Sequence, residues 1–357
     1  MDVYRGEIEA ERNPLRYALF VSFFPQLVAG PIERSKNLLN QMKNIDRIKL
    51  FDVERIFSGI ILMLWGYFMK MMIADRASAI VDKVYNSYWE YGSIELIIAS
   101  VLFAIQIYCD FGGYSLIAIG AAKVMGFNLM ENFNTPYFAT TIKDFWRRWH
   151  ISLSTWFRDY LYIPLGGNRC SKMRKNANLM ITFLVSGLWH GADWHYVVWG
   201  GLHGLYQIFE SIFEPIAKRF TISKNKKNTF SYKFGQIIRT FILADIAWIF
   251  FRADSFMSGL SILWGIITKW NPWVLFDKSL YDLGLDEKEV QILIVAILVL
   301  IIVDISRYIT GKALDRVLMD QCLWFRWFVF LGLFYMLIMF GRYGVEFEAA
   351  NFIYFQF

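Results

Sequence analysis

Charged side chains are scarce in this sequence: only 19% of its 357 residues are Asp, Glu, Lys or Arg, whereas 56% are hydrophobic and 18% are aromatic. A soluble domain of this length could not bury so many apolar side chains in one core, because soluble proteins carry more charge on their surfaces. The shortage of charge therefore excludes an ordinary soluble protein. It predicts a protein that crosses a lipid bilayer several times.

Cysteine is also rare, and several familiar motifs are missing. The three cysteines, Cys109, Cys170 and Cys322, are odd in number, far apart and without a Cys-x-x-Cys pair, so neither a disulfide framework nor a zinc site is indicated. The sequence has no internal repeat, long linker, phosphate-binding loop, dinucleotide fingerprint or nucleophile elbow. We therefore expect a single membrane domain over residues 1–357, with no bound cofactor, no metal and no covalent catalysis by a serine.

The apolar residues are gathered into six blocks, each near or above the ~20 residues that a helix needs to cross the hydrocarbon core of a bilayer. The blocks cover residues 56–73, 96–122, 179–213, 234–251, 290–305 and 323–340. Glycine and aromatic residues are scattered through them, as close helix packing and interfacial aromatic belts require. We expect an all-α, polytopic protein with about five full spans.

The distribution of charge predicts the topology. The net charge of +6 does not indicate nucleic-acid binding, because the basic residues lie in short clusters between apolar blocks. Residues 168–178 and 217–233 are basic and are expected in the cytoplasm by the positive-inside rule, whereas residues 276–289 are acidic and by complement lie outside. The block 179–213 must then enter the membrane and return to the same side, as a broken or re-entrant hairpin.

Two further segments are too short or too polar to span. Residues 18–30 form a short apolar run that contains Pro25, and this run is expected to be a buried or re-entrant helix. Residues 144–162 place Trp149 and Leu153 at helical spacing among arginines and an aspartate. That pattern predicts an amphipathic helix at the membrane interface.

The hairpin block contains the most unusual stretch of the chain, SGLWHGADWH at residues 186–195. The 12 steps from Asn178 to His190 would rise roughly 18 Å as a helix, which brings His190 within or just beyond the membrane midplane. An ionisable side chain at that depth is costly and indicates function. Burial favours the neutral imidazole, which could accept the proton of a hydroxyl that attacks a thioester. The alternative is a packing or pore-lining histidine.

The polar neighbours of His190 have more than one interpretation. Asp193 could orient the imidazole, as carboxylates do in catalytic triads, or it could mark a polar hairpin turn. His195 and His203 are expected to be structural, because His195 misses the one-face helical spacing from His190 and His203 lies in a glycine-rich stretch. A metal site made of His190, Asp193 and His195 is disfavoured, because the usual zinc-ligand spacing is missing.

Two more ionisable residues need an explanation. Asp110 interrupts an apolar helix and requires a partner, either one of the nearby arginines or a backbone donor. His150 lies in the amphipathic segment 144–162. It could position a donor or an acceptor, or share a proton path with His190, or it could simply lie beside Trp149 on a solvated helix face.

The same region carries a set of basic residues that are expected to face the cytoplasm: Arg147, Arg148, Arg158 and Arg169. Guanidinium groups bind phosphates through paired hydrogen bonds, so this set could hold an anionic donor such as coenzyme A. Anionic lipid headgroups are the other ligand that such clusters commonly take.

Several stretches together resemble the membrane-bound O-acyltransferase family, in the bacterial subgroup that O-acetylates alginate and peptidoglycan or adds D-alanine to teichoic acid. They are FFPQLVAGPIER (23–34), DFGGYSLIAIGAAKVMGF (110–127), NFNTPYFATTIKDFWRRWHISLSTWFRDYLYIPLGGNR (132–169), SGLWHGADWHYVVWGGLHG (186–204) and FIYFQF (352–357). The two histidine-bearing blocks are highly specific, and the resemblance covers essentially the whole chain. Members of the family carry several more hydrophobic segments before the DVYRG at residues 2–6, so we expect this chain to be N-terminally incomplete relative to them.

The resemblance implies an integral O-acyltransferase of the bacterial plasma membrane. His190 corresponds to the invariant histidine of the family and would act as the base, and His150 corresponds to a second, less strictly kept histidine. The expected donor is acetyl-coenzyme A in the cytoplasm, and the expected acceptor is a hydroxyl of an extracytoplasmic polysaccharide, reached through a separate extracytoplasmic acetyltransferase. The LYIPLGGNR stretch favours this branch, whereas the D-alanylation branch would use a carrier-protein thioester.

Two alternatives to an active acyltransferase stay open. A transporter could use an intramembrane histidine and aspartate as a proton relay, and it would be expected to show two corresponding broken helices, of which the sequence shows one. The chain could also be an inactive protein that keeps the histidine motif but lacks the spans that close the acyl tunnel.

Overall fold

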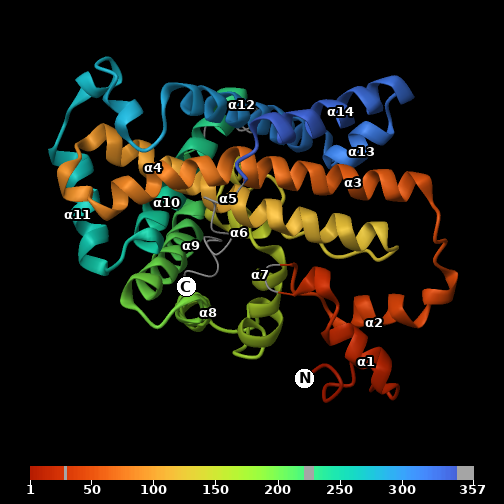
Figure 1. The fold of residues 1–357 in the computed structure, drawn as a ribbon. Helices are drawn as coiled ribbons and strands as arrows, with labels where there is room; N and C mark the ends of the chain where they lie inside the picture. Colours follow the sequence, from red (N-terminus) through yellow and green to blue (C-terminus); the bar gives the residue numbers. More distant parts are fainter. Residues whose placement is uncertain (28–29, 221–228, 344–357) are drawn as a thin grey trace.

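The computed structural model describes residues 1–27, 30–220 and 229–343, and the side chains of all of these except residues 214–220. Within these ranges the chain is helical and contains no strand (Figure 1). The α-helices are α1 (Pro14–Val21), α2 (Ser35–Lys43), α3 (Val53–Tyr67), α4 (Asp75–Asn86), α5 (Ser93–Val124), α6 (Ile142–Arg148), α7 (Ile151–Phe157), α8 (Lys172–His190), α9 (Trp194–Phe220), α10 (Phe230–Arg252), α11 (Phe256–Thr268), α12 (Glu287–Thr310), α13 (Leu314–Met319) and α14 (Leu323–Phe340). Two π-helical turns, η3 (Phe68–Ala74) and η6 (Arg158–Tyr162), continue α3 and α7. The 3-10 turns are η1 (Phe24–Gln26), η2 (Ile45–Arg47), η4 (Tyr88–Glu90), η5 (Pro136–Phe138), η8 (Pro272–Leu275) and η9 (Ser279–Asp282).

Five stretches of helix are long and apolar enough to cross a membrane: Val53–Asn86, Ser93–Val124, Phe230–Arg252, Glu287–Thr310 and Leu323–Phe340. They coincide with five of the six apolar blocks of the sequence, which confirms the expected all-α, polytopic architecture. The sixth block forms the paired helices α8 and α9 instead. Residues 221–228, in the middle of the basic loop 217–233, lie outside the described residues.

The helices α3 and α5 form the central antiparallel pair and run side by side in Figure 1. Glycines let their backbones touch, with Gly66 opposite Gly113 and Gly59 opposite Gly120. A Cβ atom on Gly66 would lie 2.5 Å from the carbonyl oxygen of Gly113, and one on Gly113 would lie 2.6 Å from that of Gly66. Only glycine permits this approach, by which membrane helices gain van der Waals contact.

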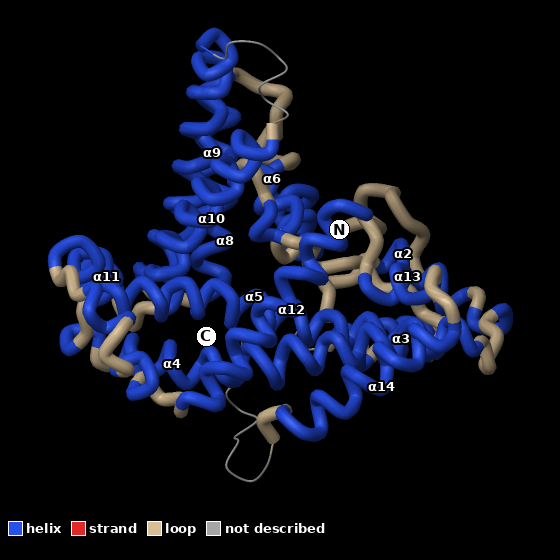
Figure 2. Tube along the Cα trace, turned by 90° about the horizontal axis from the view of Figure 1, so that it is seen from above, coloured by secondary structure: helices blue, strands red, loops and turns tan. Residues whose placement is uncertain are grey.

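The paired helices α8 and α9 form an antiparallel hairpin that is built in the same way. Gly187 approaches the carbonyl group of Tyr196, and Gly200 approaches that of Phe183, so a Cβ atom on either glycine would collide with backbone. The helix α10 packs along α9, and Figure 2 shows α8, α9 and α10 extending away from α3 and α14. The expected break is present, because α8 ends at His190 and the chain reverses directly after it.

The segment between α5 and α8 is more broken than expected. The single amphipathic helix anticipated over residues 144–162 is divided into α6, α7 and η6. The break falls at His150, whose φ of 41° is left-handed. Ile151 N–H donates to the carbonyl oxygen of Asn132 at 2.9 Å. This pairing with the preceding loop takes the hydrogen bond that a continuous helix would need, so tertiary contacts override the helical periodicity.

The N-terminal segment also differs from expectation. The apolar run 18–30 does not form one buried helix, because α1 ends at Val21 and η1 follows after an interruption. Pro25 explains the division, since proline lacks the N–H that a helix needs and disfavours helical backbone in the residue before it. None of the side chains of α1 is buried. Residues 28–29 of the run lie outside the described residues.

Candidate active site

His190 is the last residue of α8, and only 9% of it is exposed. Three aromatic rings surround its imidazole, with centroid distances of 5.0 Å to Trp189, 5.1 Å to Trp199 and 5.4 Å to Phe251. The rings of Trp199 and Phe251 stand edge-to-face to the imidazole, an arrangement typical of well-packed aromatic groups. The aromatic walls therefore shield this histidine from bulk water.

His150 is 4% exposed and does not lie on a solvated helix face. Its Nδ1 is 3.0 Å from Oδ1 of Asn132. The same oxygen accepts a hydrogen bond from the backbone N–H of Ser152 at 3.3 Å. Because a backbone N–H can only donate, this atom is the amide oxygen, and Nδ1 of His150 must be the second donor. The proton of the neutral ring therefore sits on Nδ1, and Nε2 carries the lone pair that can accept another proton.

Asn132 is the residue that fixes His150, and sequence analysis did not single it out. Its Nδ2 donates to the hydroxyl oxygen of Ser115 on α5 at 3.1 Å. Its Oδ1 also accepts a hydrogen bond from the Ser152 hydroxyl at 2.9 Å. With both ends of the amide bound, the side chain has one orientation. No local sequence signal marks this asparagine, because its partners come from α5 and α7.

The two histidines are 40 residues apart in the sequence and near enough in space to repel one another electrostatically. Burial lowers the pKa of His150, which lies outside the five spanning helices, well below its ordinary value, and repulsion from His190 lowers that pKa further. A run of rings also joins them: Trp149 lies 4.9 Å from Trp248, and Trp248 stacks at 5.6 Å on Trp199, which contacts His190. The structure thus brings both predicted site histidines into one aromatic-walled region.

The other two histidines occupy structural positions. His195 Nδ1–H donates to the carbonyl oxygen of Phe250 at 3.1 Å. His203 is fully buried among aromatic rings, with Trp199 at 5.3 Å. Asp193 is exposed and accepts a hydrogen bond from the backbone N–H of His195 at 3.4 Å, as the cap of α9. In the part of the chain that the structure describes, no group of three or more His, Cys, Asp or Glu could hold a metal ion.

Asp110 is paired with a lysine, where an arginine or a backbone donor was expected. Nζ of Lys70 lies 2.7 Å from Oδ1 of Asp110 and 2.9 Å from Oδ1 of Asp75. Both carboxylates are almost fully buried, and buried charges require such partners. The sequence held a signal for this pairing, because Lys70 interrupts the apolar block 56–73 and needs a partner for the same reason as Asp110.

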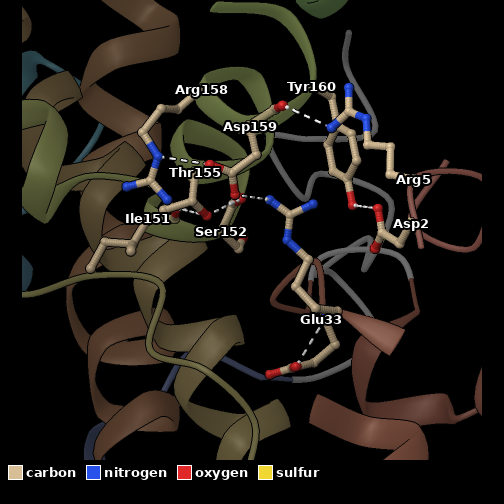
Figure 3. A network of polar contacts seen from close by, with 10 residues as sticks. Asp2, Arg5, Glu33, Ile151, Ser152, Thr155, Arg158, Asp159 and Tyr160 are labelled. Atoms are coloured by element: carbon tan, nitrogen blue, oxygen red, sulfur yellow. Dashed lines mark hydrogen bonds and ion pairs between the residues drawn. The ribbon is translucent and has the colours of Figure 1, made fainter. Parts of the chain in front are cut away.

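The described structure shows no shared contact among the four arginines that were expected to hold an anion: Arg147, Arg148, Arg158 and Arg169. Arg148 turns to Asp144 at 3.0 Å, and Arg158 turns to Asp159 at 2.8 Å. The other two are exposed. Among the described contacts, no acidic or polar group links any two of the four. Asp159, the partner of Arg158, also accepts a hydrogen bond at its backbone carbonyl oxygen from Arg5 of the N-terminal segment (Figure 3).

A cavity of about 240 Å³ lies beside the His150 site, between α3, α5, α12 and α13. Asn132 and Tyr108 line it, so the cavity wall reaches the residue that holds His150. Asp304, also in the wall, accepts a hydrogen bond from the Tyr108 hydroxyl at 3.1 Å. The volume is below the ~300–1,000 Å³ of sites for drug-sized ligands.

Two neutral imidazoles in one shielded region are chemically suited to proton transfer. Each ring can take up a proton at neutral pH only when a reaction supplies one, because burial disfavours the charged form. Repulsion between the rings opposes protonation of both together. The arrangement therefore suits a reaction in which one proton is taken from a substrate and soon returned to a leaving group.

Several known proteins have sequences similar to this chain. A model of the membrane-bound O-acyltransferase family matches residues 10–251. The probable alginate O-acetylase AlgI of Pseudomonas aeruginosa is 37% identical over 303 residues, which are 84% of this chain and 54% of the relative. The peptidoglycan O-acetyltransferase of Helicobacter pylori is 38% identical over 253 residues, or 71% of this chain and 46% of the relative. The teichoic acid D-alanyltransferase of Bacillus subtilis is 30% identical over 233 residues, which are 60% of this chain and 56% of the relative. The chain thus spans about half the length of these relatives.

Proposed function

This chain belongs to the membrane-bound O-acyltransferase family, and we propose that it moves an acyl group, most simply acetyl, from a cytoplasmic thioester to a hydroxyl of an extracytoplasmic polysaccharide. The observation that carries the proposal is the meeting of His150 and His190 in one buried region with aromatic walls. Relatives named for O-acetylation of alginate and of peptidoglycan support the choice of acetyl group and of acceptor.

In the proposed reaction His190 is the general base. It takes the proton of the attacking hydroxyl, whose oxygen forms a bond to the carbonyl carbon of the thioester. The tetrahedral intermediate then collapses with cleavage of the carbon–sulfur bond, and the departing thiolate receives the proton from the imidazolium. General-base catalysis of this kind contributes roughly 10²- to 10⁴-fold in rate. His150, with Nδ1 bound to Asn132, offers the lone pair of Nε2 to the substrate or to the transferred proton.

The proposed setting is the plasma membrane of a bacterium, with several spans in the bilayer. The basic stretch 168–178 would face the cytoplasm and the acidic stretch 276–289 the outside. Donor and acceptor are then on opposite sides of the membrane. For this reason we also propose a separate extracytoplasmic acetyltransferase as partner, which would take the acetyl group on to the polysaccharide.

Two other functions have a specific observation in their favour. The resemblance to a teichoic acid D-alanyltransferase supports D-alanyl transfer from a carrier-protein thioester. The buried group of Lys70, Asp75 and Asp110 is the kind of intramembrane charge cluster that transporters use as a proton relay. The first alternative predicts esterified D-alanine on the surface polymer, and the second predicts no esterified product.

The test measures the O-acetyl and D-alanyl ester content of surface polysaccharide in cells that express the chain, with any residues that precede it in its reading frame. His190→Ala is compared with the parent at equal membrane abundance, and we expect it to abolish O-acetylation. His195→Asn is the matched control, because the Asn side-chain amide can still donate to the Phe250 carbonyl, and it should retain acetylation. Unchanged acetylation in His190→Ala would overturn the proposal, and loss of D-alanyl esters instead would favour the D-alanyl alternative.

A further inference from the structure

Two guanidinium groups converge on the ring of Tyr160 in η6. The guanidinium carbon of Arg34 lies 4.6 Å from the ring centroid, and that of Arg5 lies 5.5 Å from it. Both arginines come from the N-terminal segment, far from the tyrosine in sequence. A ring face attracts each cation, but two cations brought this close repel one another. Their convergence therefore marks a place where negative charge is favoured.

Asp159 is the group on which three arginines meet. Its Oδ2 is 3.1 Å from Nη2 of Arg34, and its Oδ1 is 2.8 Å from Nε of Arg158. Arg5 Nη1 donates to the backbone carbonyl oxygen of Asp159 at 3.4 Å. Figure 3 shows Arg158 and Arg5 approaching Asp159 from opposite sides. One carboxylate thus occupies the centre of the group and uses both of its oxygens there.

Three acidic side chains lie in or beside the group. Beside Asp159, the acid in contact is Asp2, which accepts a hydrogen bond from the Tyr160 hydroxyl. The carboxylate of the neighbouring Glu33 accepts instead from the backbone N–H groups of Arg34 and Met130 and from Nδ2 of Asn37. In the described contacts, Asp159 is the one acid that the three guanidinium groups contact, so a single carboxylate faces them directly.

The group also has unused hydrogen-bonding capacity that a ligand can reach. Each guanidinium carries five N–H donors, and the described hydrogen bonds use a minority of them. The side chain of Arg158 is 59% exposed and that of Asp159 is 34% exposed. Accessible guanidinium forks match the geometry and charge of phosphate.

The position of the group connects it to the histidine site. Phe157 directly precedes Arg158, and its ring lies 6.4 Å from that of Trp189, the neighbour of His190. The turn η6 is π-helical, a distortion that is frequent at functional sites because it redirects side chains. A phosphate bound here would be separated from His190 by the side chains of Phe157 and Trp189.

We propose that Arg5, Arg34 and Arg158 form a binding site for a phosphate-bearing ligand, which Asp159 holds assembled by standing in for part of the phosphate charge. The shared chemistry is a phosphate mono- or diester, and two sources can supply it. One is a soluble thioester donor such as acetyl-coenzyme A, and this identification rests on the proposed function. The other is the headgroup of an anionic phospholipid.

The first experiment measures binding of free coenzyme A to the purified chain in a neutral detergent by isothermal titration calorimetry. Arg158→Gln and Arg34→Gln should each weaken binding about tenfold or more, because each removes a charge-assisted contact to phosphate. Asp159→Asn should strengthen binding, because it removes the competing carboxylate and frees two guanidinium groups. If Asp159 served only as a structural ion-pair partner, Asp159→Asn should instead weaken binding. This variant therefore tests the proposal even if an arginine variant loosens the fold. Arg47→Gln, an exposed arginine of η2, is the matched control and should bind like the parent.

The second arm distinguishes the two sources. The chain is placed in nanodiscs of phosphatidylcholine with or without phosphatidylglycerol, and coenzyme A binding is measured again. Unchanged coenzyme A binding in phosphatidylglycerol supports the soluble ligand. Competition by phosphatidylglycerol that disappears in Arg158→Gln supports the lipid headgroup at the same site. The proposal is overturned if the arginine and Asp159 variants all bind coenzyme A as the parent does and phosphatidylglycerol does not compete.

The binding assay requires no turnover, so its failure can be told apart from failure of the proposed function. The same titration is therefore repeated with His190→Ala, which should bind coenzyme A like the parent. If the arginine variants bind coenzyme A like the parent while acetylation is normal, only the proposed phosphate site is wrong. If the arginine variants weaken coenzyme A binding as expected but the chain never acetylates polysaccharide, only the proposed function is wrong.

Discussion

The side-chain oxygen of Asn132 accepts the hydrogen bond of His150 Nδ1 at 3.0 Å, and this one contact decides which nitrogen of the imidazole carries the proton. Because the same oxygen accepts from the Ser152 backbone N–H, the amide cannot be reversed without loss of both bonds. A histidine held in this way presents one fixed lone pair. Comparable partners of metal-bound and catalytic histidines contribute about 10- to 100-fold to function.

We therefore predict that Asn132→Ala lowers kcat of acyl transfer by roughly 10- to 100-fold with little change in KM. Asn132→Asp should behave differently, because a carboxylate beside the ring stabilises the imidazolium and raises the pKa of His150 from its lowered value. The acid limb of the pH profile of kcat/KM should then move to higher pH than in the parent. A profile that is identical in Asn132→Asp would show that Asn132 has no positioning role.

The contact between α3 and α5 predicts a sharp size limit at one position. Gly66→Ala should destabilise the chain by about 1–3 kcal/mol, because its Cβ would lie 2.5 Å from the carbonyl oxygen of Gly113 and the helices must separate. Gly332→Ala is the control in α14, where a Cβ atom would meet nothing within 4 Å. Thermal unfolding in detergent measures both variants. Equal melting temperatures for the two would contradict the close approach.

The buried ion pairs predict a non-additive response. Lys70→Met should destabilise by about 3–5 kcal/mol, because it leaves the carboxylates of Asp75 and Asp110 without their cation. Lys70→Met combined with Asp75→Asn and Asp110→Asn should regain much of that loss, since no uncompensated charge remains buried. Melting temperatures of the single and triple variants give the comparison. A triple variant less stable than Lys70→Met would argue against charge compensation.

The pair Lys123–Asp315 predicts a pH-dependent contribution to stability. Burial raises the pKa of Asp315, but hydrogen bonds from Lys123 and Ser58, both at 2.7 Å, outweigh it, so the pKa of this α13 residue lies below its ordinary value. A carboxyl group with a lowered pKa stabilises the fold above its unfolded-state pKa of about 4 and loses that contribution as the pH falls further. Asp315→Asn should therefore cost about 2 kcal/mol at neutral pH, and the difference should shrink below about pH 4.

Asp320→Asn provides the matched control for this pair. Asp320 also pairs with a lysine, Lys312, but both side chains are more than half exposed. Surface ion pairs contribute ~0–1 kcal/mol. The control should therefore unfold within about 1 kcal/mol of the parent at every pH, whereas a loss equal to that of Asp315→Asn would show that burial is not the reason for the effect.

The sequence predicted the spanning helices well because the signal for a span is composition over length. Five apolar blocks became five candidate spans, and the sixth formed the antiparallel hairpin of α8 and α9. The break at His190 was also foreseen, since glycine and polar residues follow the histidine directly. These features depend on short stretches of sequence and on the properties of the bilayer, not on which helices come together.

The candidate site was only half predictable. His150 and His190 stood out as ionisable residues beside aromatic ones, but the division of residues 144–162 did not, because Trp149 and Leu153 keep helical spacing across the break. The break follows from the loop at Asn132, a tertiary contact. The sequence did not predict the partner of Asp110 or the contacts of the arginines for the same reason. Spacing along a chain does not reveal which segments meet.

Trp199 stacks on Trp248 at 5.6 Å with its plane tilted by 26°, and its edge contacts the His190 ring. Indoles this close couple their electronic transitions, and near-ultraviolet circular dichroism is sensitive to such fixed packing. The molecule thus contains its own optical reporter of an assembled histidine site. The signal requires neither a label nor a turnover assay, and it can follow the site through extraction, reconstitution and storage.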